Sequence, residues 1–449
     1  MKMSKGWSIA ASVLLTATVL AGCGGGGGTN TGSGTAGNAP AGNAGTNPAS
    51  QKAVKLKFWG GVPAEAGPQA VVDAWNAKNP DIQVEYVRFV NDDNGNLKLD
   101  TALMAGQDAD LYVNYQLSRL KKRADAGLAV DLGTFKDYNI DEKMGPDAKQ
   151  WLVNDKYYGM PTKKNMSFVW LNKDMLDAAG LPLPPLDWSW EELQVYSAKL
   201  KKDKVWGTVI HEAANTTQFD GTIASLGAVK SDGTSNFNNP LWQQGFEIWH
   251  TMMHKDKTTP TYGEQFTSKM SVDTMFLKGE AAMLGAGEFV FRNANNTKDF
   301  PRSFKIAFAT WPKISKDQKD FKYPGGLGDV ISINAKSANK EAAWKFLKWY
   351  ADGGMLPMAS GGRIPSSKEV NSDEAIKLML QGVENMYDQE SLKKVVFGNF
   401  PTYQLDIDQQ VLDARKEEFE KYFLNKQDIA ATLKNMEKRH NDFIKQSKK

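Results

Sequence analysis

The sequence lacks the features on which several protein classes depend. Its 449 residues contain one cysteine, so no disulfide can form within the chain. Only four histidines occur, and the sequence has no Walker glycine loop, nucleophile elbow or cysteine–histidine pair. The formal net charge is +3 with no basic block, which argues against a nucleic-acid or other polyanionic ligand. After residue 22 no apolar run reaches the length of a membrane helix, so any membrane-crossing step falls to another protein.

The N-terminal segment carries a signal pattern. Two lysines precede an apolar stretch over residues 9–20, which suits a signal sequence and is too short to span a bilayer comfortably. The run Leu20-Ala21-Gly22-Cys23 resembles the bacterial lipobox, which implies removal of residues 1–22 and a diacyl lipid on the sulfur of Cys23. A cleaved secretory signal followed by an incidental cysteine is the alternative.

Residues 23–52 are expected to form a lipid-anchored flexible tether. Residues 24–50 contain almost only Gly, Thr, Asn, Ala, Ser and Pro, with no aromatic and no charged side chain, so they cannot build a core. Random-coil scaling gives such a segment an end-to-end distance of roughly 30 Å.

The hydrophobic periodicity after the tether predicts alternating strands and helices. Strands are expected at 54–59, 82–87 and 110–113, with helices at 70–78 and 97–106 between them. This βαβαβ order implies a parallel sheet flanked by helices, which is an α/β fold. Ligands of such sheets bind at the carboxyl ends of the strands.

The same signals continue to the end of the chain. Strands are expected at 167–171, 205–210, 281–284, 305–309 and 330–334, and helices at 190–200, 241–253, 271–278 and 340–350. Ser189 is the expected N-cap of the helix at 190–200. From about residue 373 the chain is expected to be mostly helical. Because about 400 residues follow the tether, two domains are expected.

Short motifs occur in an order typical of one family. They are FW at 58–59, NPDIQV at 79–84, YGMP at 158–161, WLNKDML at 170–176, AAGL at 178–181, WSWEEL at 188–193, FLKGEAAM at 276–283, SANKEAAWKFL at 337–347 and GGRIP at 361–365. From about residue 53 to its end the chain therefore resembles the extracellular solute-binding proteins of bacterial carbohydrate uptake transporters, the family that includes maltose-binding protein.

The resemblance implies a two-lobe periplasmic-binding-protein fold of the type II kind, in which the chain crosses three times between α/β lobes. Mapping the motifs places one lobe at 53–160 and 328–364, and the other at 161–327 and 365–449. Proteins of this architecture close their lobes around the ligand by a hinge motion.

The resemblance also implies a function. It implies a monomeric, lipid-anchored substrate-binding protein on the outer face of the bacterial membrane, without cofactor, metal or catalytic activity. The protein would capture a carbohydrate, an oligosaccharide above all, and deliver it to the permease of an ABC importer with a separate ATPase. One alternative is a surface glycoside hydrolase, which needs two carboxylates such as Glu65 and Glu288. The other is a binding protein of the same fold for a non-sugar solute or for a sensor.

Sugar binding requires flat apolar surface for the ring and fixed hydrogen-bond partners for its hydroxyls. Candidates follow strand ends and lobe crossings: Trp59, Glu65, Asn114, Tyr115, Gln116, Asn165, His211, Glu212, Asp220, Glu288, Phe289, Gly326, Asp329 and Tyr403. Alternation in the first strand predicts that Trp59 points to the face opposite to that of Leu56 and Phe58. The resemblance suggests Phe289 as a stacking platform, while Asn114 stands where maltose-binding relatives have tryptophan, which argues against a simple maltose assignment.

Other conspicuous residues have structural interpretations. Trp75, Trp151, Trp249, Trp344 and Trp349 are expected in the cores, because they lie at buried positions of periodic segments. His250 and His254 share a helix face without the glutamate of a zinc-protease motif, so no metal site is expected. Residues 91–96 lack the pattern of a calcium loop and are expected to form a solvated turn.

Overall fold

The computed structural model describes residues 53–106, 109–211, 214, 217–398, 400–403 and 407–447. The predicted signal segment, Cys23, the tether and Glu212 lie outside these residues. Among the helices of the described residues, none is both long enough and apolar enough to cross a membrane.

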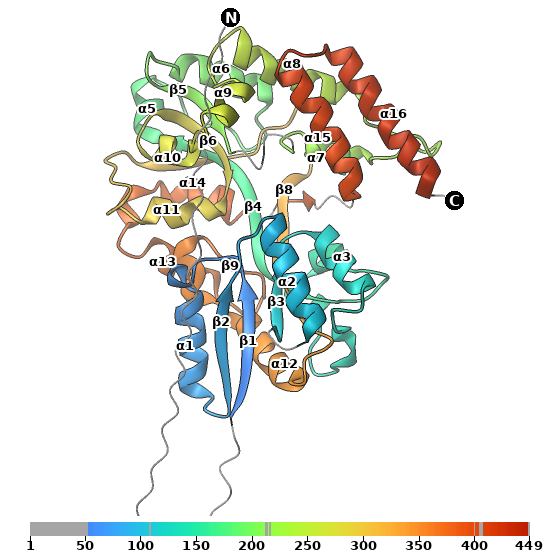
Figure 1. Ribbon diagram of the computed structural model, residues 1–449. Helices are drawn as coiled ribbons and strands as arrows, with labels where there is room; N and C mark the ends of the chain where they lie inside the picture. Colours follow the sequence, from blue (N-terminus) through green and yellow to red (C-terminus); the bar gives the residue numbers. More distant parts are fainter. Residues whose placement is uncertain are drawn as a thin grey trace, which may run out of the picture. The chain divides into compact units, whose positions relative to one another are not determined.

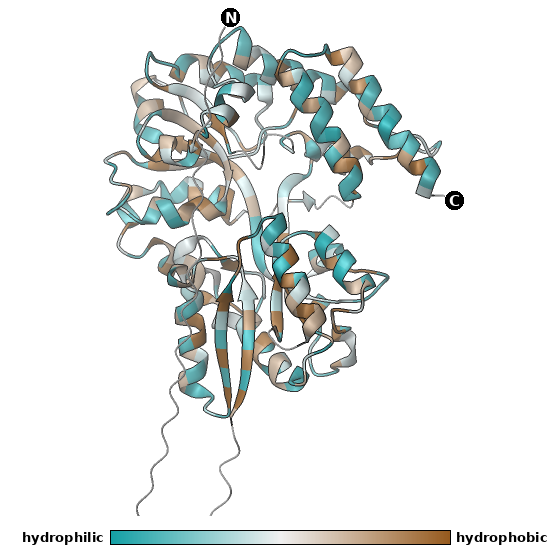
Figure 2. Ribbon diagram, in the orientation of Figure 1, coloured by the Kyte–Doolittle hydropathy of each residue, from teal (hydrophilic) through white to brown (hydrophobic). Residues whose placement is uncertain are grey.

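The first part of the described chain is the predicted βαβαβ unit (Figure 1). Strand β1 (Val54–Gly60) pairs in parallel with β2 (Ile82–Arg88) and with β3 (Leu111–Asn114), and the helices α1 (Pro68–Lys78) and α2 (Asp93–Ala105) connect them. The alternation of hydropathy along β1 and β2 is visible in Figure 2. It buries one row of side chains in the core and leaves the other more accessible, as the sequence predicted.

Two long strands join the two halves of the sheet. The first part of β4 (Met160–Asn172) pairs antiparallel with β8 (Tyr323–Ile333), from Met160 opposite Ile331 to Met166 opposite Gly325. From Ser167 onward β4 pairs instead with β6 (Ala281–Gly287) and β7 (Ile306–Thr310). The other end of β8 pairs with β3, which gives the strand order β2-β1-β3-β8-β4-β6-β5. Thus β4 belongs to both lobes.

The remaining elements of the first lobe and the crossings, in chain order, are η1 (Ala64–Ala66), α3 (Leu117–Asp125), η2 (Leu132–Thr134), α4 (Ile140–Met144), η3 (Pro146–Trp151), α12 (Lys340–Trp349), η6 (Tyr350–Gly354), η7 (Leu356–Gly361) and β9 (Ile364–Pro365). The short strand β9 pairs with β4, with Pro365 opposite Lys163 and Ile364 opposite Lys164.

With the lobe bounds predicted from the motifs, the second lobe contains most of the helices of the described residues. Its further elements are α5 (Lys173–Ala178), α6 (Trp190–Leu200), β5 (Trp206–Ile210), α7 (Asp220–Leu226), α8 (Pro240–His254), α9 (Tyr262–Thr267), α10 (Val272–Leu277), η5 (Glu288–Val290), α11 (Phe291–Asn295), α13 (Ser372–Leu380), η8 (Glu384–Met386), α14 (Gln389–Ser391), η9 (Leu392–Val396), β10 (Thr402–Tyr403), α15 (Gln409–Phe423) and α16 (Ile429–Ser447). The helical C-terminal part is confirmed.

Helix starts follow the local chemistry of the sequence. Ser189 caps α6 as predicted: its Oγ accepts a hydrogen bond from the Glu192 backbone N–H, and the Glu192 carboxylate accepts one from the Ser189 N–H at 2.9 Å. Such a capping box contributes about 1 kcal/mol. The expectation of a solvated turn at 91–96 is wrong, because the Asp92 carboxylate accepts a hydrogen bond from the Gly95 N–H at 2.7 Å and starts α2 at Asp93.

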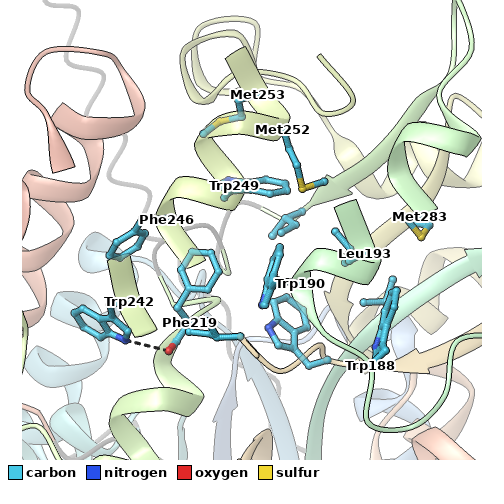
Figure 3. Close-up of a cluster of buried hydrophobic side chains, with 14 of the residues drawn as sticks. Trp188, Trp190, Leu193, Phe219, Trp242, Phe246, Trp249, Met252, Met253 and Met283 are labelled. Atoms are coloured by element: carbon cyan, nitrogen blue, oxygen red, sulfur yellow. Dashed lines mark hydrogen bonds between the residues drawn. The ribbon is translucent and has the colours of Figure 1, made fainter. Parts of the chain in front are cut away.

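The second lobe has an aromatic core, shown in part in Figure 3. Trp190 packs against Phe219 and Trp249, and Trp242 donates a hydrogen bond from Nε1 to the carbonyl of Phe219 at 3.1 Å. Of the five tryptophans expected in cores, Trp75, Trp151, Trp249 and Trp344 are at most 5% exposed, and Trp349 packs half-buried against Trp75. The core prediction is therefore confirmed for Trp75, Trp151, Trp249 and Trp344, whereas Trp349 is only partly buried.

Candidate functional site

A pocket of about 500 Å³ lies where β4 and β8 cross between the lobes. We call it the crossing pocket. Its lining comes from both lobes and from the crossings: Gly61, Asn91, Tyr115, Trp151, Lys163, Asn165, Met166, Ser167, Gly287, Glu288, Phe289, Gly325, Leu327, Asp329 and Arg363. Its volume lies in the range of pockets that hold small molecules.

A second pocket of about 540 Å³, the adjoining pocket, shares Asn165, Met166, Glu288 and Leu327 with the crossing pocket. Its other residues are Lys164 and Gly326 on the crossing strands and residues of the segments 144–147, 364–368 and 396–402. The hydroxyl of Thr402 donates a hydrogen bond to the Asp147 carboxylate at 3.1 Å. The lobes are thus in direct contact beside the crossing strands.

Four charged side chains of alternating sign line the crossing pocket. The ammonium of Lys163 on β4 is paired with the Glu288 carboxylate, whose second oxygen accepts a hydrogen bond from the Met166 N–H at 3.0 Å. Lys163 Nζ also lies 3.9 Å from Asp329 Oδ1, and Arg363 Nε lies 3.3 Å from Asp329 Oδ2. The side chains of these four residues are between 5% and 11% exposed. Little water therefore reaches them, and each charge is balanced mainly by its neighbours of opposite sign.

The phenol of Tyr115 fixes the first-lobe wall of the pocket. Its oxygen accepts a hydrogen bond from the Gly61 N–H at 2.7 Å, which ties the loop after β1 to the loop after β3. Burial and the nearby carboxylate of Asp329 raise the pKa of Tyr115, so the phenol keeps its proton at neutral pH and can donate a hydrogen bond.

Aromatic surface lies on the second-lobe side. Phe289, half-buried on η5, meets the ring of His211 edge to face, with centroids 4.9 Å apart. On the other side, Trp151 is buried and donates from Nε1 to the carbonyl of Leu327 at 2.8 Å. The pocket therefore combines a ring that sugars can stack on with carboxylate, amide and phenol groups that can bind hydroxyls.

The backbone of β8 is unusual beside the pocket. Gly326 has φ +105° and Asp329 has φ +45°, both in the left-handed region. A Cβ on Gly328 would lie 1.9 Å from the amide nitrogen of Asn165, so any larger residue at position 328 would displace that amide. This segment holds Asp329 and Asn165 in the positions that line the pocket.

Six of the predicted site residues come together at the two pockets: Tyr115, Asn165, Glu288, Phe289, Gly326 and Asp329. All but Gly326 line the crossing pocket, and Gly326 lines the adjoining one. Their convergence could be expected, because they follow strand ends or stand on crossing strands that meet at one edge.

Two residues predicted for the cleft are buried elsewhere. Trp59 is 7% exposed and packs in a separate cluster with Phe89, Leu99 and Leu103, because α2 covers that face of β1. Asn114 is fully buried: its amide group donates to Ser332 Oγ at 2.9 Å and accepts from Arg123 Nη1 at 2.8 Å. The structure therefore removes both side chains from the candidate site.

Two further candidates, the buried Asp220 and the partly exposed Tyr403, lie close to each other and away from the crossing pocket. Asp220 is buried in a bidentate ion pair with Arg415, at 2.8 and 3.0 Å, so its oxygens are already engaged. Tyr403 on β10 lies near the same pair, where burial and the Asp220 charge raise its pKa. Neither residue lines the pockets described above.

The remaining candidates do not line the crossing pocket. Glu65 is exposed on η1, and Gln116 is exposed immediately before α3. His211 lines a different pocket of the second lobe.

The lining residues that the sequence interpretation missed include four with polar or aromatic side chains: Asn91, Trp151, Lys163 and Arg363. Lys163 and Arg363 had a sequence signal, because Lys163 follows the Pro161 crossing and Arg363 belongs to the GGRIP motif. Trp151 was assigned to the core, and it is both a core residue and part of the pocket wall.

Among the described residues, no three His, Cys, Asp or Glu side chains are grouped to hold a metal ion. The rings of His250 and His254 are in contact, with centroids 4.3 Å apart and planes tilted by 39°, and both bond to Asn425: His250 Nε2 at 2.6 Å and His254 Nδ1 at 3.2 Å. These bonds join α8 to the turn after α15, which is a structural role.

The architecture is that of a two-lobe protein with a pocket at the crossings between the lobes. Residues 59–352 match the family of bacterial extracellular solute-binding proteins, and the chain belongs to this family. The family prediction and the two-lobe α/β fold are thereby confirmed.

Individual similarities are distant. A Brucella abortus protein named as a binding protein is 26% identical over 296 residues, which cover 63% of this chain and 68% of the relative. The maltotriose-binding protein of Pyrococcus abyssi is 24% identical over 339 residues, covering 71% and 69%. The structure of an ABC substrate-binding protein of Listeria monocytogenes in complex with cycloalternan superposes with a TM-score of 0.70 at 20% identity, covering 88% of this chain and 99% of that one.

Proposed function

We propose that this protein captures a carbohydrate in the crossing pocket and delivers it to the permease of an ABC importer powered by a separate ATPase. The observation that carries the proposal is the pocket itself, where Phe289 stands beside Asn165, Glu288 and Asp329 at the junction of both lobes. The names of the maltotriose-binding relative and of the cycloalternan complex support a sugar ligand.

The charge balance of the pocket favours a neutral, hydroxyl-rich ligand. Lys163 and Arg363 are each paired with a carboxylate, so an anionic ligand would have to compete with Glu288 and Asp329 for them. Sugar hydroxyls can instead donate to carboxylate oxygens and accept from the ammonium and guanidinium groups without breaking either pair. These groups already face the ligand position, which lowers the cost of ordering them on binding.

The geometry disfavours the glycoside hydrolase alternative. A general acid must reach the leaving-group oxygen of the substrate, whereas the two carboxylate oxygens of Glu288 are engaged by the Lys163 ammonium and by the Met166 N–H. Its proposed partner Glu65 is an exposed residue of η1 outside the lining of the crossing pocket. We therefore propose a binding role without catalysis.

Calorimetric titration tests the proposal most directly. The protein without residues 1–22 is titrated with a panel of plant and bacterial oligosaccharides, and the bound sugar is recovered after long incubation. We expect saturable 1:1 binding of at least one member, recovery of intact sugar, and a smaller radius of gyration in scattering as the lobes close. Absence of binding across the panel would argue against a carbohydrate ligand. Release of shorter sugars faster than by a Glu65→Gln, Glu288→Gln control would favour hydrolysis.

Location on the membrane is proposed from the lipobox-like sequence before Cys23. Lipid on this sulfur would hold a monomeric binding protein at the outer face of the membrane, within reach of its permease. The variant Cys23→Ser loses the attachment atom and should move from the membrane fraction to the soluble fraction of washed cells. Retention of the variant in the membrane fraction would contradict lipid anchoring without affecting the carbohydrate proposal.

A further inference from the structure

Arg123 of α3 lies at the centre of a buried polar network in the first lobe. Its guanidinium donates hydrogen bonds from Nε to the Asp100 carboxylate at 2.7 Å, from Nη1 to Asn114 Oδ1 at 2.8 Å and from Nη2 to Asn96 Oδ1 at 2.9 Å. Arg123, Asn96 and Asn114 are at most 4% exposed. None of the four residues lines the crossing pocket, yet both amides lead to residues that do.

The first connection runs through Asn96 to Asn91. A guanidinium can only donate hydrogen bonds, so it requires the oxygen of the Asn96 amide to face it. The amide nitrogen is therefore turned the other way, and it donates to Asn91 Oδ1 at 3.1 Å and to the Asp92 carbonyl at 2.8 Å. Asn91 lines the crossing pocket, and its own amide nitrogen has no partner among the described residues. The group that Asn91 has left for a ligand is thus a hydrogen-bond donor.

The second connection runs through Asn114 to the ends of two strands. The amide oxygen of Asn114 accepts from the guanidinium, and its nitrogen donates across to β8, to Ser332 Oγ at 2.9 Å and to the Val330 carbonyl at 3.3 Å. Asn114 directly precedes Tyr115 in the chain, and Val330, its partner in the β3–β8 ladder, directly follows Asp329. Tyr115 and Asp329 both line the crossing pocket, so this amide joins the strands immediately beside them.

We infer that Arg123 is a positioning residue of the crossing pocket. Through Asn96 it fixes Asn91 as a donor towards the ligand, and through Asn114 it holds the strand ends that carry the phenol and the carboxylate of the pocket wall. The planar guanidinium can do both because its N–H groups point in fixed directions, whereas a lysine ammonium on a flexible stem cannot reach both amides. This inference rests on the proposed carbohydrate function.

A double-mutant cycle tests the inference, with a sugar of the calorimetric panel that binds wild type. Arg123→Lys keeps the charge beside Asp100 and should weaken the affinity of the folded protein about fivefold or more, and Asn91→Ala should weaken it about threefold. The loss in the double variant should fall short of the product of the two single losses, because Asn91 is no longer oriented once the guanidinium is gone. Arg119→Lys is the matched control, since Arg119 stands on the same helix, pairs with the exposed Asp93 and lines neither pocket.

Hydrogen exchange of the Asn96 side-chain amide provides a readout that needs no ligand. In protein labelled with ¹⁵N-asparagine, this amide should exchange slowly in wild type and in Arg119→Lys, and at least tenfold faster in Arg123→Lys. If Arg123→Lys does not fold, Asn96→Ala breaks the connection to Asn91 and leaves the Arg123–Asp100 pair in place. Its loss of affinity should likewise fail to multiply with that of Asn91→Ala.

The outcomes separate this inference from the function on which it rests. If wild type binds sugar but folded Arg123→Lys binds it equally well, Arg123 has a structural role only. Full multiplication of the single losses, an unchanged affinity of Asn91→Ala, or unchanged exchange of the Asn96 amide would also overturn the inference, although the carbohydrate proposal stands. If no sugar binds wild type, the carbohydrate proposal fails and this inference fails with it.

Discussion

Two clusters of buried charge in this protein have similar chemistry and different surroundings. In the second lobe, Arg415 binds both oxygens of Asp220, and its guanidinium lies 5.5 to 6.0 Å from the ring centroids of Phe237, Trp242 and Phe419. Both side chains are at most 5% exposed. At the crossings, the four charges of Lys163, Glu288, Asp329 and Arg363 are nearly as well buried but line a cavity.

The difference lies in what remains available for a ligand. Aromatic rings enclose the Asp220–Arg415 pair, and its two short hydrogen bonds use both carboxylate oxygens, so the pair can only stabilise the fold. In the crossing pocket, Asp329 serves two cations at 3.9 and 3.3 Å, beyond ideal hydrogen-bond length. Its oxygens retain capacity for ligand hydroxyls. Buried charge therefore identifies a binding site only where it meets a cavity.

The largest expected effect is on the enclosed pair. Arg415→Met leaves Asp220 buried without its partner and should lower the free energy of unfolding by about 3 to 5 kcal/mol. Urea denaturation measures this loss, and calorimetry should show unchanged sugar affinity for the protein that remains folded. The double variant Asp220→Leu, Arg415→Met should recover most of the stability, since it removes both charges. A marked loss of affinity in the folded single variant would contradict the separation between the two clusters.

A substitution in the crossing pocket should cost less stability and more sugar affinity than a substitution in the Asp220–Arg415 pair. Glu288→Gln keeps the shape and removes the ion pair with Lys163, which retains Asp329 as a neighbour at 3.9 Å. We expect a stability loss of about 1 to 3 kcal/mol and at least a tenfold loss of sugar affinity, about 1.4 kcal/mol or more. Denaturation and calorimetry on one preparation measure both. Unchanged affinity would show that these charges support the crossing strands alone.

The smallest stability effect is expected for the ring at the pocket wall. Phe289→Ala should lower sugar affinity about five- to tenfold and the unfolding free energy by less than about 1.5 kcal/mol, because the ring is only half-buried. Trp344→Ala is the core control. Trp344 is 3% exposed, stacks on Phe135 at 4.5 Å and should cost about 3 to 5 kcal/mol without changing the affinity of folded protein. Equal destabilisation by the two variants would place Phe289 in the core.

The fold was largely predictable because its signals are local. Strand alternation in β1, the capping box at Ser189 and the amphipathic stripe of α12 each depend on residues within a few positions. The start of β8 was missed, because the glycines at 325, 326 and 328 do not favour a strand, and pairing with β4 holds them in one. The lobe boundaries remain a prediction drawn from motifs.

The site was less predictable because its contacts join distant segments. Strand alternation correctly predicted that Trp59 and Phe58 point to opposite faces of β1. It could not show that Leu99 and Leu103 of α2 cover the face on which Trp59 lies. Asn114 ends a strand as a binding residue would, yet Arg123 and the distant Ser332 occupy its amide. Only the folded chain places Lys163 against Glu288, which is 125 positions away.

The shared strand β4 sets different limits on changes of length and changes of side chain. Deleting one residue between Lys163 and Met166 would reverse the facing of every later residue of the strand, from Ser167 to Asn172, against both β6 and β7. Replacing the side chain of Asn165 alters the pocket and leaves that register intact. Variants of this protein should therefore tolerate substitutions in β4 between Lys163 and Met166 better than insertions or deletions there. A substitution can change the lining of the pocket while both halves of the sheet keep their pairing.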